Sequence, residues 1–217
     1  MRVKFDAQLK NLNEEMIQMG TMIEENIREA IRALVDGDIE NAQKIIEKDS
    51  LIDQKQRDIE NICFNLLIQQ QPVAKDLRAI TAAMKMVTDM ERIGDHAADI
   101  SEITILLGRS DGIANCNLIV KMASEATDML IKSIDAFTEK DAEKAKAVIE
   151  QDDVVDELFT KIKDELIKLI KKDSERGEQE IDMLMIAKYL ERIGDHATNI
   201  AEWVIYSLDD KKEKAAK

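Results

Sequence analysis

The sequence predicts an all-α protein made of two tandem, sequence-related three-helix bundles with six long helices. Its composition is the first reason: the 217 residues include one proline, seven glycines and 3% aromatic residues, against 45% hydrophobic and 35% charged residues. This composition is typical of long helices joined by few turns. The second reason is that the string ERIGDHA occurs at 91–97 and again at 191–197. An internal repeat of this kind indicates a duplicated structural unit.

Three helices are predicted in the first half, where apolar residues recur at spacings of three and four. The first helix ends at the turn around Gly37, and Asp38 can cap the second. Pro72 ends the second helix, and Gly108 closes the third. The predicted ranges are about 5–35, 39–71 and 73–107.

The turn-rich segment 108–115 (GRSDGIAN) is the expected boundary between the halves. A fourth helix follows it to about residue 137, a fifth begins at the cap Asp141 and runs to about 172, and a sixth covers about 178–208. The predicted organisation is therefore a first bundle at 1–109, a second bundle at 113–210, and a charged, frayed tail at 211–217.

The net charge of −14 argues against nucleic acid and anionic lipid as direct partners. No stretch approaches the roughly 18 apolar residues of a membrane span. The first ten residues, MRVKFDAQLK, contain no apolar core of a signal peptide. We therefore expect a cytosolic protein without direct membrane insertion.

Cys63 and Cys116 stand in no CxxC arrangement, so we expect both to be reduced and inert.

The repeated motif places acidic residues in a stripe along one side of a helix. In the third predicted helix Glu91, Asp95 and Asp99 stand at i, i+4 and i+8. The sixth helix repeats the stripe with Glu191 and Asp195. Like charges at this spacing destabilise an isolated helix, and a solvated acidic face is the simplest interpretation of one such stripe.

The second and fifth helices favour metal binding over a solvated acidic face, because each carries a pair of aspartates on a largely apolar face. Carboxylates on an interior face need a cation or hydrogen-bond donors. If the pair meets the acidic stripe, a multivalent cation is the expected partner. The candidate ligands in the first half are Asp49, Asp53, Glu91, Asp95 and Asp99, and those in the second half are Asp152, Asp156, Glu191 and Asp195.

Oxygen-only ligand sets suit hard cations such as Mg²⁺, Mn²⁺ or iron, and several carboxylates could bridge more than one ion.

The other residues of the motif have different expected roles. His96 and His196 fall roughly 140° around the helix from the motif glutamates, so we expect them to form hydrogen bonds at the bundle surface. The mid-helix glycines Gly94 and Gly194 suggest close helix packing. Arg92 and its repeat Arg192 either hold a carboxylate or are solvated.

These features resemble the PhoU family of bacterial phosphate-uptake regulators. The resemblance rests on the tandem halves, on the ExxxD pattern within ERIGDHA and on the stretch PVAKDLR at 72–78. It implies a cytoplasmic protein that works with the phosphate ABC transporter ATPase and a phosphate sensor histidine kinase. It also implies negative regulation of the phosphate-starvation response, without enzyme activity, and peripheral association with the membrane through protein partners.

The resemblance further implies multinuclear clusters of divalent or trivalent metal ions, such as iron, Mg, Mn or Zn, on the acidic motifs, and it allows a homodimer. Carried over by position, the resemblance also implies Asn199 as a ligand in the second half, where it departs from an all-acid ligand set. Two alternatives stay open: a carboxylate-metal-dependent enzyme, and a metal-free helical adaptor. The sequence offers no serine or cysteine nucleophile motif and no glycine-rich phosphate loop for the enzyme alternative.

Overall fold

The computed structural model describes residues 2–70, 72–108 and 116–209. Within these ranges the chain forms six α-helices, one short 3-10 helix and no strand. The all-helical prediction is therefore confirmed. The elements in chain order are α1 (Arg2–Asp36), α2 (Ile39–Gln70), α3 (Ala74–Leu107), α4 (Cys116–Glu139), α5 (Ala142–Lys172), η1 (Ser174–Arg176) and α6 (Gly177–Leu208).

Local capping explains where several helices begin and end. Asp38 Oδ1 accepts a hydrogen bond from the backbone N–H of Asn41 at 3.0 Å, and Asp141 accepts from the N–H groups of Glu143 and Lys144. Both caps were expected from the sequence, because a carboxylate satisfies N–H groups that the first turn leaves unpaired. Gly108 closes α3 with a φ of 62°, a backbone conformation that favours glycine.

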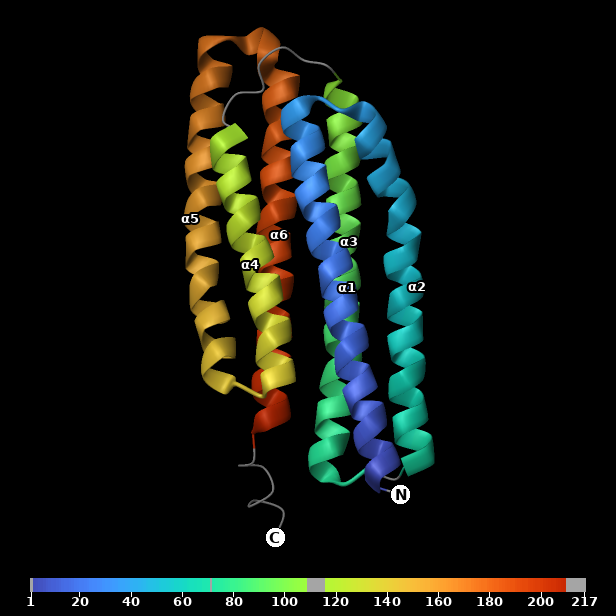
Figure 1. Cartoon of the computed structure of the whole chain (residues 1–217). Coiled ribbons are helices and arrows are strands. Elements are labelled where there is room, and N and C mark those ends of the chain that lie inside the picture. The colour runs from blue at the N-terminus through green and yellow to red at the C-terminus, as the bar shows by residue number, and fades with distance from the viewer. Residues whose placement is uncertain (1, 71, 109–115, 210–217) are drawn as a thin grey trace.

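The six helices form two elongated three-helix bundles that lie side by side (Figure 1). The bundles meet mainly through α3 and α6, with a smaller contact between α1 and α4. The outer helices are α2, which packs on α1 and α3, and α5, which packs on α4 and α6. Each acidic motif is therefore on a helix that faces its own outer helix and also the other half.

The core includes an apolar stripe on each motif helix. Met86, Met90, Ile93, Ala97 and Ile100 of α3 are fully buried. The repeat residues Leu190, Ile193, Ala197 and Ile200 of α6 are buried in the same way. Burying each large aliphatic side chain contributes roughly 1.5–3 kcal/mol. The same stripe that stabilises the bundle thus fixes which way the acidic side of each helix points.

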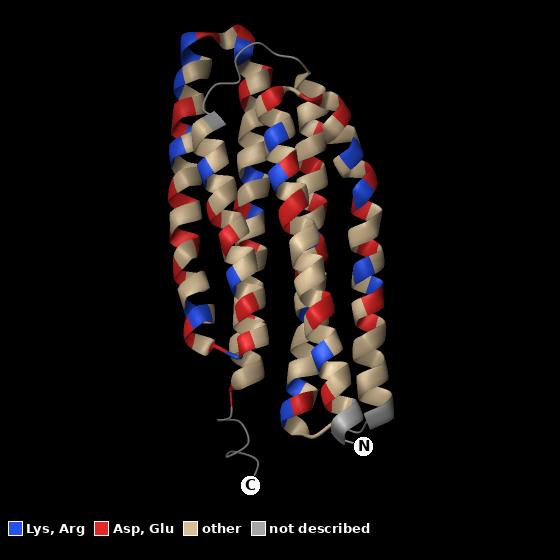
Figure 2. Ribbon diagram, in the orientation of Figure 1, with Lys and Arg blue, Asp and Glu red and all other residues tan. Residues whose placement is uncertain are grey.

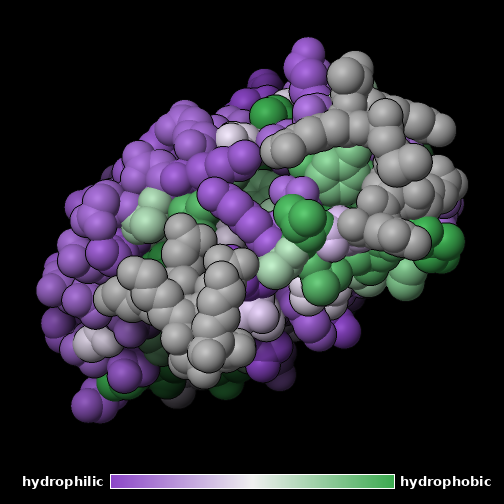
Figure 3. All heavy atoms as spheres, turned by 90° about the horizontal axis from the view of Figure 1, so that it is seen from below, coloured by the Kyte–Doolittle hydropathy of each residue, from purple (hydrophilic) through white to green (hydrophobic). Residues whose placement is uncertain are grey.

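Both basic and acidic residues lie along the outer helices α2 and α5 (Figure 2). Seen end-on from below, apolar side chains gather over the first bundle (Figure 3). Large exposed apolar residues near the α2–α3 connection are Phe64, Ile68, Val73 and Leu77. Among the described residues, no helix is long and apolar enough to cross a membrane.

Some predictions fall on residues that the structure leaves undescribed. Of the expected boundary at 108–115, residues 109–115 lie outside the described residues, as does the expected tail at 211–217. The limits 1–109 and 113–210 therefore stay predictions.

Cys63 is buried, and burial raises the pKa of its thiol to about 12, which keeps it protonated and unreactive. The side chain of Cys116 is not among those described.

Candidate metal centres

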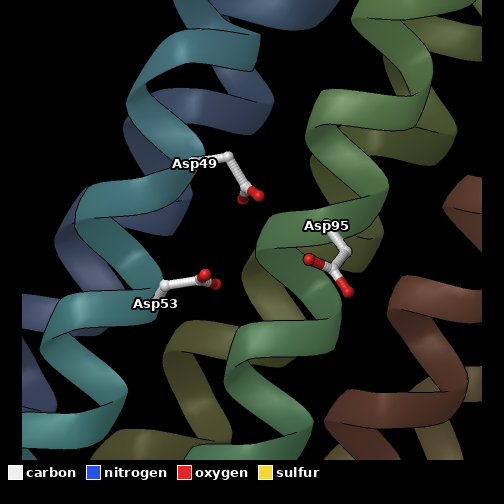
Figure 4. Close-up of side chains that lie close together, drawn as sticks. All are labelled: Asp49, Asp53 and Asp95. Carbon is white, nitrogen blue, oxygen red and sulfur yellow. The ribbon is translucent and has the colours of Figure 1, made fainter.

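In the first bundle, α2 and α3 bring three carboxylates together. One oxygen each from Asp49, Asp53 and Asp95 lies within 4.8 Å of the others. Figure 4 shows Asp49 and Asp53 pointing from α2 toward Asp95 on α3. The spacing i, i+4 places the two α2 residues one turn apart on the same side of their helix. Oxygen atoms at this separation can surround one hard cation.

Gly94 lets the two helices approach at the level of these carboxylates. A Cβ atom at this position would lie only 3.0 Å from both Cδ1 and Cγ2 of Ile52. Because Ile52 is itself buried, it has little room to withdraw. Close helix packing, expected from the mid-helix glycine, is therefore confirmed, and this packing brings Asp49 and Asp53 up to Asp95.

The clustered carboxylates repel one another and are partly removed from water. Burial raises the pKa of Asp49 to about 6, with further contributions from the charges of Asp95, Asp53 and Asp99. Burial also raises the pKa values of Glu91 and Asp95. Asp49 Oδ1 is buried without a hydrogen-bond partner, a condition that costs about 1–3 kcal/mol unless the oxygen is satisfied. A bound cation would satisfy this oxygen and remove the repulsion.

Two arginines approach the first cluster from its rim. Arg92 Nη1 lies 3.4 Å from Asp95 Oδ2, and Arg92 Nε lies 3.7 Å from Glu91 Oε2. Arg57 Nη1 lies 3.8 Å from Asp53 Oδ2. Both arginine side chains are more than half exposed, at 58% and 54%. Exposed ion pairs of this kind contribute about 0–1 kcal/mol, so they compensate the cluster only weakly.

The other two predicted ligands of the first half lie at its edge. Glu91 stands one turn before Asp95 and is engaged by Arg92. Asp99 Oδ2 lies 3.1 Å from Nδ1 of His96. Only Asp49, Asp53 and Asp95 thus form the tight group, while Asp99 remains close enough for its charge to raise the pKa of Asp49.

The second bundle repeats the arrangement with a looser set of carboxylates. Burial raises the pKa of Asp152 to about 6, and the charges of Asp156, Asp195 and Glu191 raise it further. A Cβ atom on Gly194 would lie 3.0 Å from Asp152 Oδ1 and 3.3 Å from Val155 Cγ1. Even so, within the described part of the chain, the three carboxylates of the first bundle are the only three that each place an oxygen within 4.8 Å of the others.

A lysine that the site prediction did not include reaches the second set. Lys188 Nζ forms an ion pair with Glu191 on the same helix and lies 5.5 Å from the ring centre of Phe159 on α5. Its charge lowers the pKa of Asp195, opposing the larger effects of burial and of Glu191. A signal was present in the sequence, because position 88 of the first repeat holds a threonine where the second holds this lysine.

Asn199 and the two histidines lie at the junction of the bundles. Asn199 Nδ2 donates to Asp89 Oδ1 of the first half at 3.3 Å. His196 Nδ1 lies 2.8 Å from the same oxygen. The rings of His96 and His196 have centroids 5.7 Å apart, and His96 stacks on Tyr189. The expected histidine hydrogen bonds are present. That of His196 joins the two halves, whereas His96 is buried and its Nδ1 pairs with Asp99 on its own helix.

Comparison with known proteins identifies the family. The PhoU domain model matches the chain twice, at residues 16–104 and 119–204. The chain belongs to the PhoU family. This confirms the resemblance carried by the repeated motif, and the two matched segments correspond to the two bundles.

Similar PhoU proteins cover nearly the whole chain. A "phosphate-specific transport system accessory protein PhoU homolog" of Clostridium acetobutylicum is 39% identical over 96% of this chain and 95% of its own length. The crystal structure of PhoU from Pseudomonas aeruginosa superposes with a TM-score of 0.88 and 34% identity, covering 94% of this chain and 98% of that one. PhoU from Streptococcus pneumoniae, described as a phosphate transport system regulatory protein, gives a TM-score of 0.86 at 31% identity, with coverage of 94% and 96%.

Proposed function

We propose that this protein regulates phosphate uptake as an accessory protein of a phosphate transport system. The support is the near full-length similarity to PhoU proteins that carry this description. In the finer form of the proposal, the protein binds the ATPase of a phosphate ABC transporter and a sensor histidine kinase in the cytoplasm, and represses the phosphate-starvation response when phosphate is plentiful. The relatives' names describe an accessory and regulatory role rather than catalysis, which favours this function over a metal-dependent enzyme.

The net charge and the exposed apolar residues indicate how the protein would associate with the membrane. A net charge of −14 disfavours direct binding to anionic headgroups. Exposed apolar residues at the end formed by α2 and α3 offer a surface for a protein partner. Contact with the membrane is therefore proposed to pass through the transporter. Sedimentation with anionic liposomes that contain no partner protein would contradict this.

The metal proposal concerns the first cluster, where Asp49, Asp53 and Asp95 would hold a hard cation. Three observations of the site fit such an ion: the separation of the oxygens, the unpartnered Asp49 Oδ1, and the glycine that draws α2 onto α3. A bound cation would supply positive charge to neutralise the carboxylates, and the ligands would then fasten α2 to α3. Its identity among iron, Mg, Mn and Zn, and a multinuclear cluster that includes Glu91 and Asp99, stay predictions.

The second ligand set also stays a prediction, and its residues fit a cation less well. Asp152, Asp156 and Asp195 do not reach the same mutual separation, Glu191 is paired with Lys188, and Asn199 donates to the other half. A homodimer likewise remains a prediction.

Deletion of the gene tests the regulatory proposal. In a host without a second PhoU protein, the deletion strain should express phosphate-starvation genes even in phosphate-rich medium, and the intact gene supplied in trans should restore repression. Normal repression in the deletion strain would contradict the proposal. A complementing copy with Asp49→Asn and Asp95→Asn then shows whether the first cluster is needed for the regulation.

A further inference from the structure

The two halves differ at one position of the repeated motif helix that bears directly on the carboxylates. Counting back three residues from the motif glutamates gives Thr88 in α3 and Lys188 in α6. Thr88 is exposed, and its Oγ1 donates to the carbonyl of Met84 on its own helix at 3.3 Å. It brings no charge to the first cluster. Lys188, in contrast, forms an ion pair with Glu191.

The aromatic ring of Phe159 holds Lys188 in place from the neighbouring helix. The ammonium group lies 5.5 Å from the ring centre, within the range of a cation–π contact. The matching position of α2, obtained from the pairing of Asp49 with Asp152, is Gln56, which has no aromatic face. The second half therefore has both a lysine and an aromatic ring that orients it, and the matching positions of the first half have neither.

Lys188 differs from the arginines that border the first cluster. Its side chain is 40% exposed and that of Glu191 is 16% exposed, so the pair is less solvated than the pairs of Arg57 and Arg92. Those arginines remain 3.4–3.8 Å from the carboxylates. The Coulombic attraction within a less exposed pair is stronger than that within a rim pair. Lys188 is thus the better placed of these cations to compete with a metal.

The charges of the predicted ligands also favour metal binding at the first cluster over the second set. When ionised, the five predicted ligands of the first half carry five negative charges, whereas the second half offers four carboxylates, because Asn199 donates to Asp89 of the first half instead. Lys188 reduces the charge of the second set by one more. Hard cations respond strongly to the number of charged oxygen ligands. A divalent ion there would also be repelled by the ammonium group.

We propose that Lys188 acts as the resident cation of the second carboxylate set and thereby restricts metal binding to the first. The two bundles, although duplicated, then have different roles: α2 and α3 are fastened by a metal ion that can be gained or lost, and α5 and α6 by a side chain that is always present. This inference rests on the proposed metal site of the first bundle.

Exchanging the two residues tests the proposal with Mn²⁺ as the probe. Purified full-length protein, stripped with chelator, is titrated with Mn²⁺ by calorimetry and by electron paramagnetic resonance, and folding of each variant is verified by circular dichroism. The parent should bind at the first cluster only, and Asp49→Asn should abolish this binding. Lys188→Thr should add a second binding event, which Asp152→Asn then removes. Thr88→Lys should weaken the first site roughly 10- to 100-fold, the range seen when a group next to a metal ligand is changed.

Two further variants are controls, one that keeps the positive charge of residue 188 and one that removes a different lysine of the second bundle. Lys188→Arg keeps the charge and should leave the second set closed to Mn²⁺. Lys161→Thr removes a lysine of α5 that pairs with Glu157 at 3.3 Å and should leave binding unchanged. Equal binding at both clusters in the parent, or no new event in Lys188→Thr, would overturn the role of Lys188 while leaving the first metal site in place. No binding by the parent or by Lys188→Thr would overturn both proposals.

Discussion

His196 on α6 lies with its Nδ1 atom 2.8 Å from Oδ1 of Asp89 on α3, across the junction of the two bundles. The same carboxylate oxygen accepts a hydrogen bond from Asn199 at 3.3 Å. Asp89 is 17% exposed and stands two residues before the motif glutamate of α3. One carboxylate of the first half thus receives two contacts from the second half.

Replacing Asp89 by asparagine should weaken this junction. The amide keeps the shape but loses the negative charge, so we expect the free energy of unfolding to fall by about 1–3 kcal/mol. Urea denaturation at neutral pH measures the effect. Glu102→Gln, which removes a charge from an exposed position of the same helix, is the matched control and should change stability by less than about 0.5 kcal/mol. Equal effects of the two variants would show that the Asp89 contacts contribute nothing specific.

A second variant examines Asn199, which the sequence places in register with Asp99. Asn199→Asp would set a carboxylate against that of Asp89 in place of an amide donor. We expect a loss of about 1 kcal/mol in unfolding free energy above pH 6 and no gain in Mn²⁺ affinity. Asp99→Asn, titrated beside it, should weaken the first site if Asp99 is a ligand. Tighter Mn²⁺ binding by Asn199→Asp would show that this side chain reaches the second carboxylate set after all.

Gly94 offers a test of how closely α2 must approach α3. Alanine gains about 1 kcal/mol in helix propensity, but its Cβ would lie 3.0 Å from two atoms of the buried Ile52. Overpacking of this kind costs typically 1–3 kcal/mol, so Gly94→Ala should be net destabilising by up to about 2 kcal/mol in urea denaturation. The double variant with Ile52→Val, which removes Cδ1, should recover part of the loss.

A control for this variant is Gly177→Ala in the first turn of α6. A Cβ there meets nothing within 4 Å, so the change should be neutral or stabilising. Were Gly94→Ala as stable as the parent, the packing of α2 against α3 would be looser than the structure indicates.

The pKa of Asp49 predicts how stability depends on pH when no metal is present. Its pKa is raised from 3.8 to about 6, chiefly by burial. A carboxyl with a raised pKa in the folded state destabilises that state when ionised. The destabilisation is full above about pH 6 and fades as the pH falls from 6 toward 3.8. In excess chelator, Asp49→Asn should therefore raise the unfolding free energy at pH 8 by about 1–2 kcal/mol, allowing for solvent screening.

At pH 4.5 the same substitution should have a much smaller effect, because the parent carboxyl is then largely protonated in the folded protein. Asp152→Asn should behave similarly, since the pKa of Asp152 is also raised to about 6. Urea midpoints of both variants at pH 8 and 4.5 provide the comparison. A destabilised Asp49→Asn variant at pH 8 without metal would mean that its carboxylate has a partner in the folded state.

Much of the fold followed from local patterns. Apolar spacing and the caps Asp38 and Asp141 were sufficient to locate the helices to within a few residues, because capping and periodicity act over one or two turns. The pairing of Asp49 and Asp53 with Asp95 could also be anticipated. All three residues lie on adjacent helices of one bundle, where the apolar stripes fix the facing sides.

The contacts between the halves could not be predicted in the same way. His196 and Asn199 take their positions from the packing of α6 on α3, an arrangement that no periodicity within one helix encodes. The role of Lys188 depends likewise on Phe159, which belongs to a different helix. Repeat comparison alone shows the exchange of threonine for lysine, but the three-dimensional structure is needed to see which carboxylate the lysine reaches.

Elemental analysis is the most direct test of the central claim that α2 and α3 together hold a metal ion. The protein is to be purified without chelators and without a metal-affinity tag, beside a variant carrying Asp49→Asn and Asp95→Asn. We predict at least one equivalent of a hard metal ion per chain in the parent and none in the variant, with both proteins folded. Equal metal contents in the two proteins, or a parent that stays metal-free even after incubation with Mn²⁺ and Fe²⁺, would contradict the account.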